Sequence, residues 1–274
     1  MKIQFLGTAA AEGWPGLFCQ CDACRKAKAL GGKNIRTRSS CLINDAYLVD
    51  FPPDTYMHMV NNKLDLGSVE HLFITHSHRD HFFPTDLLNR KPNFAHLTTK
   101  SCLNVYGNDT VVRKGNETKK LENCPDEIVM FHEVFPFETF KAGDMLVTPL
   151  LAAHDRSERC YIYIFEIGGQ KLLYGHDSGI FPDESWSFID KTRFDAVIFE
   201  CTKGPGKVAV RYHMGAEDVL EVKKRMEDNG SIDSKTRLYV THFSHNGKLL
   251  HHELEEIFQP HGFEVAYDGK TVEF

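Results

Sequence analysis

Short runs of alternating or β-branched apolar residues recur along the chain, and Gly, Pro, Asn or Asp bounds most of them. This pattern is typical of strands that end in turns. The runs predict strands over residues 3–6, 41–50 with a turn at Asn44-Asp45, 71–75, 145–150, 161–167, 171–174, 196–201 and 238–241. A last hairpin is expected over 263–274 with its turn at Asp268-Gly269, because Asp-Gly is a strong hairpin signal.

Helical spacing of apolar residues is clearest over 215–228, and further helices are expected over 54–61, 84–89 and 252–258. The polar stretch 108–123 predicts a solvated surface region. Strands with helices between them predict a layered α/β (α+β) fold. We find no linker or repeat that would divide the chain, so one domain over residues 1–274 is expected.

Composition places the chain among ordinary globular proteins, since 42% of its 274 residues are hydrophobic and 26% are charged. The net charge of −6 and the absence of a dense Lys/Arg block argue against a protein whose main task is to bind nucleic acid. No run of about 18 apolar residues and no signal sequence is found, so we expect a cytoplasmic protein without a membrane partner. The unusual feature is the presence of 15 histidines.

Three histidines and an aspartate follow the apolar run 71–75. Residues at positions i and i+2 of an extended chain project to the same side, so His76 and His78 can share one metal ion, and a turn lets Asp80 and His81 face a second. Imidazole and carboxylate ligands together suit Zn, Mn or Fe. The remaining ligands are expected where other buried strands open into loops, at His154, Asp177 and His242.

A second cluster of candidate ligands lies in a Gly/Pro-rich loop over about residues 13–26, which contains Cys19, Cys21 and Cys24. Thiolates this close in a reducing compartment are better suited to zinc than to disulfides, and a closed structural site needs a fourth ligand. His245 is the candidate, three residues beyond His242. The alternative is a set of free thiols.

The spacing from His76 to Asp80-His81, and then to His154, Asp177 and His242, resembles the metallo-β-lactamase superfamily. The resemblance implies an αββα sandwich, with two mixed sheets flanked by helices. It also implies that His76, His78 and His154 hold a first ion, that Asp80, His81 and His242 hold a second, and that Asp177 bridges both. The cysteine loop is similar to that of the PhnP-type phosphodiesterases (phosphoribosyl cyclic phosphodiesterases), in which a structural Zn²⁺ is bound by residues matching Cys19, Cys21, Cys24 and His245.

His213 precedes the helix expected over 215–228, and the resemblance implies that it assists catalysis, either by protonating the leaving oxygen or by holding the phosphate. Such a proton donor is needed because an alkoxide leaves a phosphodiester slowly. The candidate catalytic residues are therefore His213 and Asp80. In this family, Gly is usual soon after the last histidine of the motif, but here Phe82 and Phe83 follow it. Both are expected to belong to the core, and the alternative is that they stack on a base or sugar of the substrate.

The function expected from these residues is that of a metal-dependent hydrolase, a phosphodiesterase that cleaves a small cyclic or nucleotide-like phosphodiester with a hydroxide shared by two divalent ions (Mn²⁺, Zn²⁺ or Fe). Two alternatives stay open, namely an RNA-processing nuclease resembling tRNase Z and a non-catalytic metal- or redox-sensing protein. The expected partner is the small substrate and not nucleic acid. The oligomeric state is left open, a homodimer included.

Overall fold

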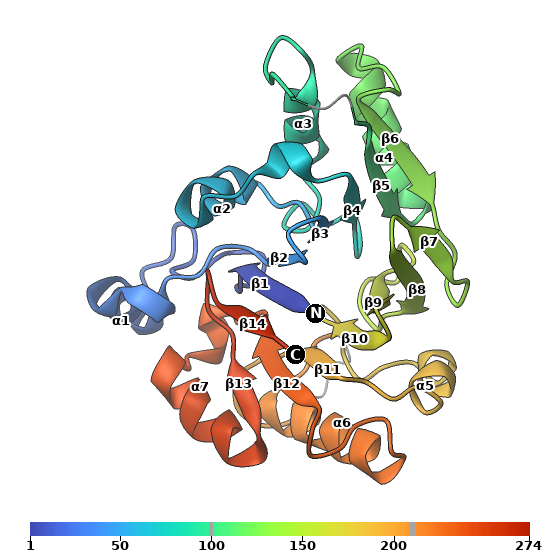
Figure 1. Cartoon of the computed structure of the whole chain (residues 1–274). Coiled ribbons are helices and arrows are strands. Elements are labelled where there is room, and N and C mark those ends of the chain that lie inside the picture. The colour runs from blue at the N-terminus through green and yellow to red at the C-terminus, as the bar shows by residue number, and fades with distance from the viewer. Residues whose placement is uncertain (99–100, 209–211) are drawn as a thin grey trace.

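The computed structural model describes residues 1–98, 101–208 and 212–274. Two sheets of seven strands each lie against one another (Figure 1). The first sheet has the order β14-β1-β2-β3-β4-β5-β6 and the second has the order β13-β12-β11-β10-β9-β8-β7. Each sheet contains both parallel and antiparallel pairs, for example β3 with β4 and β1 with β2 in the first.

Most strands lie in the expected runs, but the sequence pattern does not predict the strands over 103–107, 129–133 and 140–142. Those of the first sheet are β1 (Lys2–Gly7), β2 (Ser40–Ile43), β3 (Tyr47–Val49), β4 (His71–Phe73), β5 (Leu103–Gly107), β6 (Val129–Glu133) and β14 (Thr271–Glu273). Those of the second are β7 (Phe140–Ala142), β8 (Met145–Leu151), β9 (Tyr161–Ile167), β10 (Gln170–Gly175), β11 (Ala196–Glu200), β12 (Arg237–Thr241) and β13 (Phe263–Val265).

Helices cover the outer faces of the two sheets (Figure 1). The helices over the first sheet are α2 (Thr55–Asn62), α3 (Pro84–Leu87) and α4 (Asp109–Leu121). Those over the second are α5 (Asp183–Ile189), α6 (Ala216–Asp228) and α7 (His251–Phe258), while α1 (Asp22–Leu30) lies at one edge. Short 3-10 turns are η1 (Gly32–Asn34), η2 (Leu66–Ser68), η3 (Leu88–Arg90), η4 (His245–Gly247) and η5 (Gln259–His261). The arrangement is the expected αββα sandwich.

Alternation along the strands divides the core into three layers. In β10, Leu172 and Tyr174 point between the sheets, whereas Leu173 points toward the outer helices. In β4, Phe73 faces the other sheet and Leu72 faces the helices of its own side. Because side chains alternate with a period of two, each central strand is buried on both faces, which explains its nearly continuous apolar sequence.

The hairpin expected over 263–274 is wrong, because its two strands belong to different sheets. β13 pairs with β12 in the second sheet and β14 pairs with β1 in the first. Asp268 accepts hydrogen bonds from Thr8 Oγ1 (2.7 Å) and from the backbone N–H of Thr37 (2.6 Å), both in loops of the first sheet. The Asp-Gly pair therefore carries the chain from one sheet to the other.

The polar stretch 108–123 folds mostly as α4, a surface helix that the sequence pattern does not predict. Asn108 caps the helix by accepting a hydrogen bond from the backbone N–H of Val111 (2.8 Å). The buried residues of α4 are Val111, Gly115 and Lys119, and the aliphatic part of a lysine can take the place of an apolar residue in such a stripe. The helix therefore has a buried face that a count of apolar residues does not reveal.

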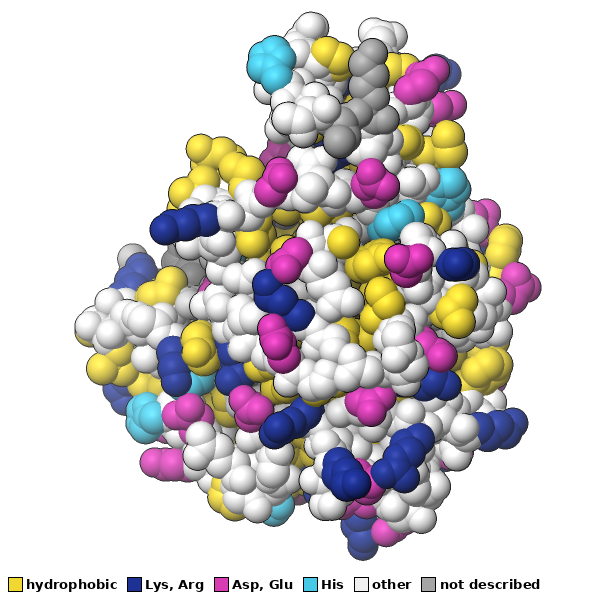
Figure 2. Space-filling view, viewed as in Figure 1, with side chains coloured by type: hydrophobic (Ala, Val, Ile, Leu, Met, Phe, Trp, Pro, Cys, Tyr) yellow, Lys and Arg dark blue, Asp and Glu magenta, His cyan; other side chains and the backbone are white. Residues whose placement is uncertain are grey.

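The surface in Figure 2 carries Lys and Arg side chains interspersed with Asp and Glu side chains. Among the described residues, none of the helices combines the length and the apolar character needed to cross a bilayer.

Candidate functional site

The candidate ligands of the metal pair come from loops that follow strands of both sheets. The segment from His76 to His81 follows β4 of the first sheet. The second sheet contributes His154 after β8, Asp177 after β10 and His242 after β12. Two of these residues, Asp177 (φ 58°) and His242 (φ 57°), have left-handed backbone conformations, which cost free energy in residues other than glycine and often occur at functional sites.

The structure brings all seven expected ligands of the metal pair together in two adjoining groups. His76, His78 and His154 form one group, in which His154 Nε2 lies 3.2 Å from His78 Nδ1. The other group consists of Asp80, His81, Asp177 and His242, whose ligand atoms all lie within 4.8 Å of one another.

Asp177 lies between the two groups. Its Oδ2 atom is 3.4 Å from His76 Nε2 in the first group and 3.1 Å from His81 Nε2 in the second. Burial opposes ionisation of this carboxyl group, but the neighbouring imidazoles of His242 and His154 hold its pKa well below the usual range. An ionised carboxylate at this position can reach an ion in either group, as expected of a bridging ligand.

Each of the five histidines has one ring nitrogen bound to an orienting partner, while the other faces the cluster. This is the usual arrangement of metal-binding histidines, because the second hydrogen bond fixes the tautomer and the ring orientation. The contacts are His76 Nδ1 with Thr75 Oγ1 (3.0 Å), His78 Nε2 with Asp155 Oδ2 (2.9 Å), His81 Nδ1 with Asp50 Oδ2 (2.7 Å), His154 Nδ1 with the carbonyl oxygen of Tyr212 (3.2 Å) and His242 Nδ1 with Thr202 Oγ1 (2.7 Å).

The donor atoms that face the cluster are suited to metal ions. Among the buried polar atoms of the described residues, His76 Nε2, His81 Nε2, His242 Nε2 and Asp177 Oδ1 have no hydrogen-bond partner. Leaving several such atoms unpaired in one place is costly unless a ligand takes them up. The set of imidazoles and carboxylates suits Zn, Mn or Fe, so the residues present fit the expected pair of ions.

Asp50, Glu200, Thr202 and Asp155 were not among the candidates from the sequence. Asp50 follows β3 and Glu200 ends β11, so both occupy the same kind of strand end as the ligands. Both side chains are completely buried. An acidic residue at the end of an apolar strand is the sequence feature that could have identified them. Such residues are also common in ordinary turns, so the feature alone does not indicate a site.

His213 lies beside the Asp177 carboxylate. Its Nδ1 atom is 3.0 Å from Asp177 Oδ1 and 3.4 Å from Glu200 Oε1. Burial disfavours the charged ring, but these two carboxylates raise the pKa of His213 to about 10. The residue is held in place by its neighbour Met214, whose backbone N–H donates a hydrogen bond to Glu200 Oε1 (2.6 Å).

A cavity of about 470 Å³ opens on the side of the first group. It is lined by His78, His154, Asp155, Arg156, Lys203, Tyr212 and His213. The Arg156 guanidinium lies 5.8 Å from the centre of the Tyr212 ring. A cavity of this volume holds a small molecule, and its two cationic side chains favour an anionic one.

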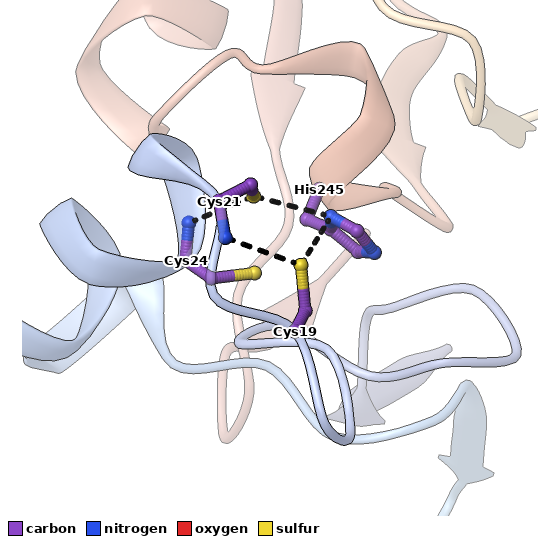
Figure 3. Close-up of side chains that lie close together, drawn as sticks. All are labelled: Cys19, Cys21, Cys24 and His245. Carbon is purple, nitrogen blue, oxygen red and sulfur yellow. Dashed lines mark hydrogen bonds between the residues drawn. The ribbon is translucent and has the colours of Figure 1, made fainter.

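The cysteine loop and His245 form a separate cluster (Figure 3). Cys19 Sγ and Cys21 Sγ each lie 3.6 Å from His245 Nδ1. The backbone N–H of Cys24 donates to Cys21 Sγ at the N-terminus of α1 and lowers the pKa of the Cys21 thiol to about 6, whereas burial raises the pKa of Cys24 to about 12. Three sulfurs and one imidazole nitrogen are the ligand set of a structural zinc site.

Of the two aromatic residues that follow the motif, Phe82 takes the expected core position and Phe83 does not. Phe82 is buried and packs against Phe131 on the outer face of the first sheet, while Phe83 is half-buried. His176, which precedes Asp177, is completely buried against Tyr174 and has no hydrogen-bond partner for either ring nitrogen among the described residues.

A comparison with family models matches residues 47–243 to the beta-lactamase superfamily domain. The chain belongs to the beta-lactamase superfamily. This match contains both groups of candidate ligands, and together with the two-sheet architecture it confirms the expected superfamily and its hydrolase fold. The comparison with curated proteins returns no match.

Several solved structures share this fold over the whole chain. One is a diphosphatase of the PhnP family, with 22% sequence identity, coverage of 100% of this chain and 97% of that one, and a TM-score of 0.76. Another is Zn²⁺-bound PqqB from Methylobacterium extorquens, with 19% identity, full coverage of both chains and a TM-score of 0.78. The short form of human tRNase Z has 17% identity, coverage of 100% and 99%, and a TM-score of 0.70. At these identities the likeness shows a shared fold.

Proposed function

We propose that this protein is a metal-dependent phosphodiesterase acting on a small cyclic or nucleotide-like phosphodiester. The observation that carries the proposal is the position of Asp177, whose carboxylate lies within 3.4 Å of His76 in one ligand group and of His81 in the other. Two ions held in this way would lower the pKa of a water molecule and neutralise the charge that develops on a phosphoryl oxygen. The proposed ions are Mn²⁺, Zn²⁺ or Fe at this pair, and Zn²⁺ at the cysteine cluster.

The residues of the cavity support a small anionic substrate. Arg156 and Lys203 can attract and orient a phosphoester at the mouth of the site, and Tyr212 offers an aromatic surface for the organic part. Asp155 also lines the cavity, but its carboxylate already accepts hydrogen bonds from His78 and from the backbone N–H of Ser157 (2.7 Å). Arg156 and Lys203 are therefore the cationic side chains of the described lining that can face an anionic substrate.

His213 is proposed as the proton donor for the leaving oxygen. It lines the cavity and lies next to the bridging Asp177, so a phosphodiester bound at the metal pair would place its ester oxygen within reach of this ring. Positioned acid catalysis of this kind contributes about 10²- to 10⁴-fold to the rate. Asp80, the other candidate catalytic residue, acts as a ligand, and its carboxylate lies 3.2 Å from His81 Nε2.

The test is hydrolysis of bis(p-nitrophenyl) phosphate by the protein loaded with Mn²⁺, Zn²⁺ or Fe²⁺. We expect turnover by the wild-type protein, loss or weakening of the paired ions in Asp177→Ala, and unchanged metal content but about 100-fold lower turnover in His213→Ala. His252→Ala, which changes an exposed histidine of α7, is the matched control and should behave as the wild type.

Two outcomes would overturn the proposal or part of it. Absence of turnover with every one of these metals would favour a metal- or redox-sensing protein. Full activity of His213→Ala would exclude its role as proton donor. A precursor tRNA included as a second substrate separates the RNA-processing alternative, since a small-molecule phosphodiesterase should leave it intact.

A further inference from the structure

Glu158 joins the two loops that carry the ligands of the first ion. It lies on the loop after β8, four residues beyond His154, and both of its carboxylate oxygens contact Ser77. Ser77 Oγ donates a hydrogen bond to Oε1 (2.7 Å), and the backbone N–H of Ser77 donates to Oε2 (3.1 Å). Ser77 is the residue between His76 and His78, so this contact bridges the two sheets at the centre of the motif.

The remaining polar atoms of Ser77 are also fixed. Lys114 Nζ donates to Ser77 Oγ (2.8 Å) and to its carbonyl oxygen (3.2 Å), and the Ser77 side chain is almost completely buried. Glu158 is anchored in turn by Asn108, the cap of α4, which donates from Nδ2 to Oε2 (2.8 Å). The N–H, the hydroxyl and the carbonyl of one residue are thus all bound to side chains from outside the motif.

The backbone of Ser77 determines where the two flanking imidazoles point. On an extended segment, His76 and His78 project to the same side only while the residue between them keeps its dihedral angles. The loop of Glu158 also holds the third ligand, His154, and the orienting partner of His78, Asp155. All three histidine ligands of the first ion are therefore tied to one short segment, residues 154–158.

We propose that Glu158 is a positioning residue of the first metal ion: its carboxylate fixes Ser77 and thereby presets His76 and His78 against His154. The inference rests on the pair of ions in the proposed function. Asp80, His81 and His242 of the second ion have no contact with Glu158 among the hydrogen bonds and ion pairs of the described residues. The effect of Glu158 is therefore selective for one ion.

The expected effect follows from what each substitution leaves behind. Glu158→Ala removes the acceptors of the Ser77 N–H and hydroxyl, and it should weaken binding of the first ion about 10- to 100-fold, as is common for partners that orient metal ligands. Glu158→Gln can keep an oxygen at the Oε2 position, facing Ser77 N–H and Asn108. It should therefore bind the first ion with most of the wild-type affinity. Ser77→Ala keeps the N–H contact and loses only the hydroxyl, so its affinity should be intermediate.

The experiment is a stepwise Co²⁺ titration of the metal-free protein, followed by absorption spectroscopy, with native mass spectrometry to count the bound ions. His76→Ala and His242→Ala serve as references for loss of the first and the second ion. Glu133→Ala is the matched control, because Glu133 is a neighbouring acid that pairs with Arg159 (3.0 Å) and does not contact Ser77 among the described residues. The melting temperature of each metal-free variant is measured in parallel.

Selective weakening of the first ion in Glu158→Ala, with recovery in Glu158→Gln and no change in Glu133→Ala, would support the inference. The inference would be overturned if Glu158→Ala bound both ions more weakly to the same extent, or if it bound the first ion with the affinity of the wild type. If the wild-type protein bound no ion beyond that of the cysteine cluster, the proposed function would fail first. If instead the wild-type protein binds the pair of ions and Glu158→Ala binds them equally well, only the inference about Glu158 fails.

Discussion

His81 Nδ1 lies 2.7 Å from Asp50 Oδ2, and both side chains are completely buried. The other oxygen of Asp50 accepts hydrogen bonds from the backbone N–H (2.8 Å) and the hydroxyl (3.0 Å) of Thr75. Asp50 thus joins the end of β3 to the first residues of the motif loop and keeps the proton of His81 on Nδ1. The Nε2 atom is then free to bind a metal ion.

Asp50→Asn should weaken binding of the second ion about 10- to 100-fold. The two Thr75 donors hold the amide oxygen, so the amide NH₂ turns toward His81 and requires Nδ1 to accept, which moves the ring proton to Nε2 and blocks coordination. Metal content after dialysis against a chelator measures the effect. Asp54→Asn, which changes a partner of Arg38 near the start of α2, is the control, and equal retention of metal by both variants would contradict the argument.

Thr202→Val should impair the site through His242. The substitution keeps the shape of the side chain but removes the acceptor of His242 Nδ1 and a donor to Glu200. We expect a loss of about 1–3 kcal/mol from the free energy of unfolding, since buried partners are left unpaired. Chemical denaturation checks the stability, and competition with a chelator checks the metal affinity. Thr202→Ser retains the hydroxyl and should resemble the wild type; if it is as impaired as Thr202→Val, packing and not the hydrogen bond is responsible.

Gly16→Ala should release the zinc ion proposed for the cysteine cluster. A Cβ atom at this position would lie 2.8 Å from His245 Nε2 and 3.3 Å from Cys19 Cβ, so His245 would be displaced from the sulfurs. We expect one zinc ion fewer per chain by elemental analysis, as in Cys21→Ser, with the paired ions retained. Cys102→Ser, which alters a cysteine outside the cluster, should keep all of its metal. Zinc content equal to the wild type in Gly16→Ala would show that the cluster does not need His245 in this position.

His58 makes stability depend on pH. Burial lowers its pKa to about 4, although nearby Asp54 favours the charged ring. In the unfolded chain the pKa is about 6.5, so the unfolded state binds more protons between these values, and the contribution of His58 is complete above pH 6.5 and is lost as the pH falls toward 4. The loss from pH 7 to 5 amounts to about 2 kcal/mol.

His58→Gln should therefore flatten the fall of the melting temperature between pH 6.5 and 4, when compared with the wild type in the metal-loaded state. The glutamine can keep a hydrogen bond to the hydroxyl of Thr37, whose Oγ1 atom lies 2.8 Å from His58 Nε2. His252→Gln changes an exposed histidine and should leave the profile as it is. Parallel profiles of His58→Gln and the wild type would rule out this source of pH dependence.

The sequence predicts most of the strands, and the candidate ligands that the structure brings together, for the same physical reason. A buried strand needs a continuous apolar run, so the first His or Asp after it stands out, as His154 and His242 do. Asp50 and Glu200 follow equally apolar runs, but a single acidic residue after a strand is also the ordinary way to begin a turn. Their roles depend on which strands become neighbours, and that is a property of the tertiary structure.

The errors in the predicted elements have a related cause. Asp268-Gly269 has the local chemistry of a hairpin turn, but Asp268 is bound by Thr8 and Thr37 of the first sheet, so long-range contacts decide its use. The buried face of α4 is formed by Val111, Gly115 and Lys119, of which only the first is a typical core residue. Local patterns predict an element well when its buried face is apolar, and poorly when glycine or the stem of a lysine is used.

The ligands of each proposed ion come from both sheets, with the motif loop on one side and His154 or His242 on the other. An ion can bind this complete set of ligands only when the two halves of the sandwich are docked. Metal binding therefore raises the free energy of unfolding by RT ln(1 + [M]/Kd), where [M] is the free metal concentration. The lifetime of this chain against proteolysis should then follow the metal supply of its surroundings. Starvation for metal would deplete the protein itself as well as its activity.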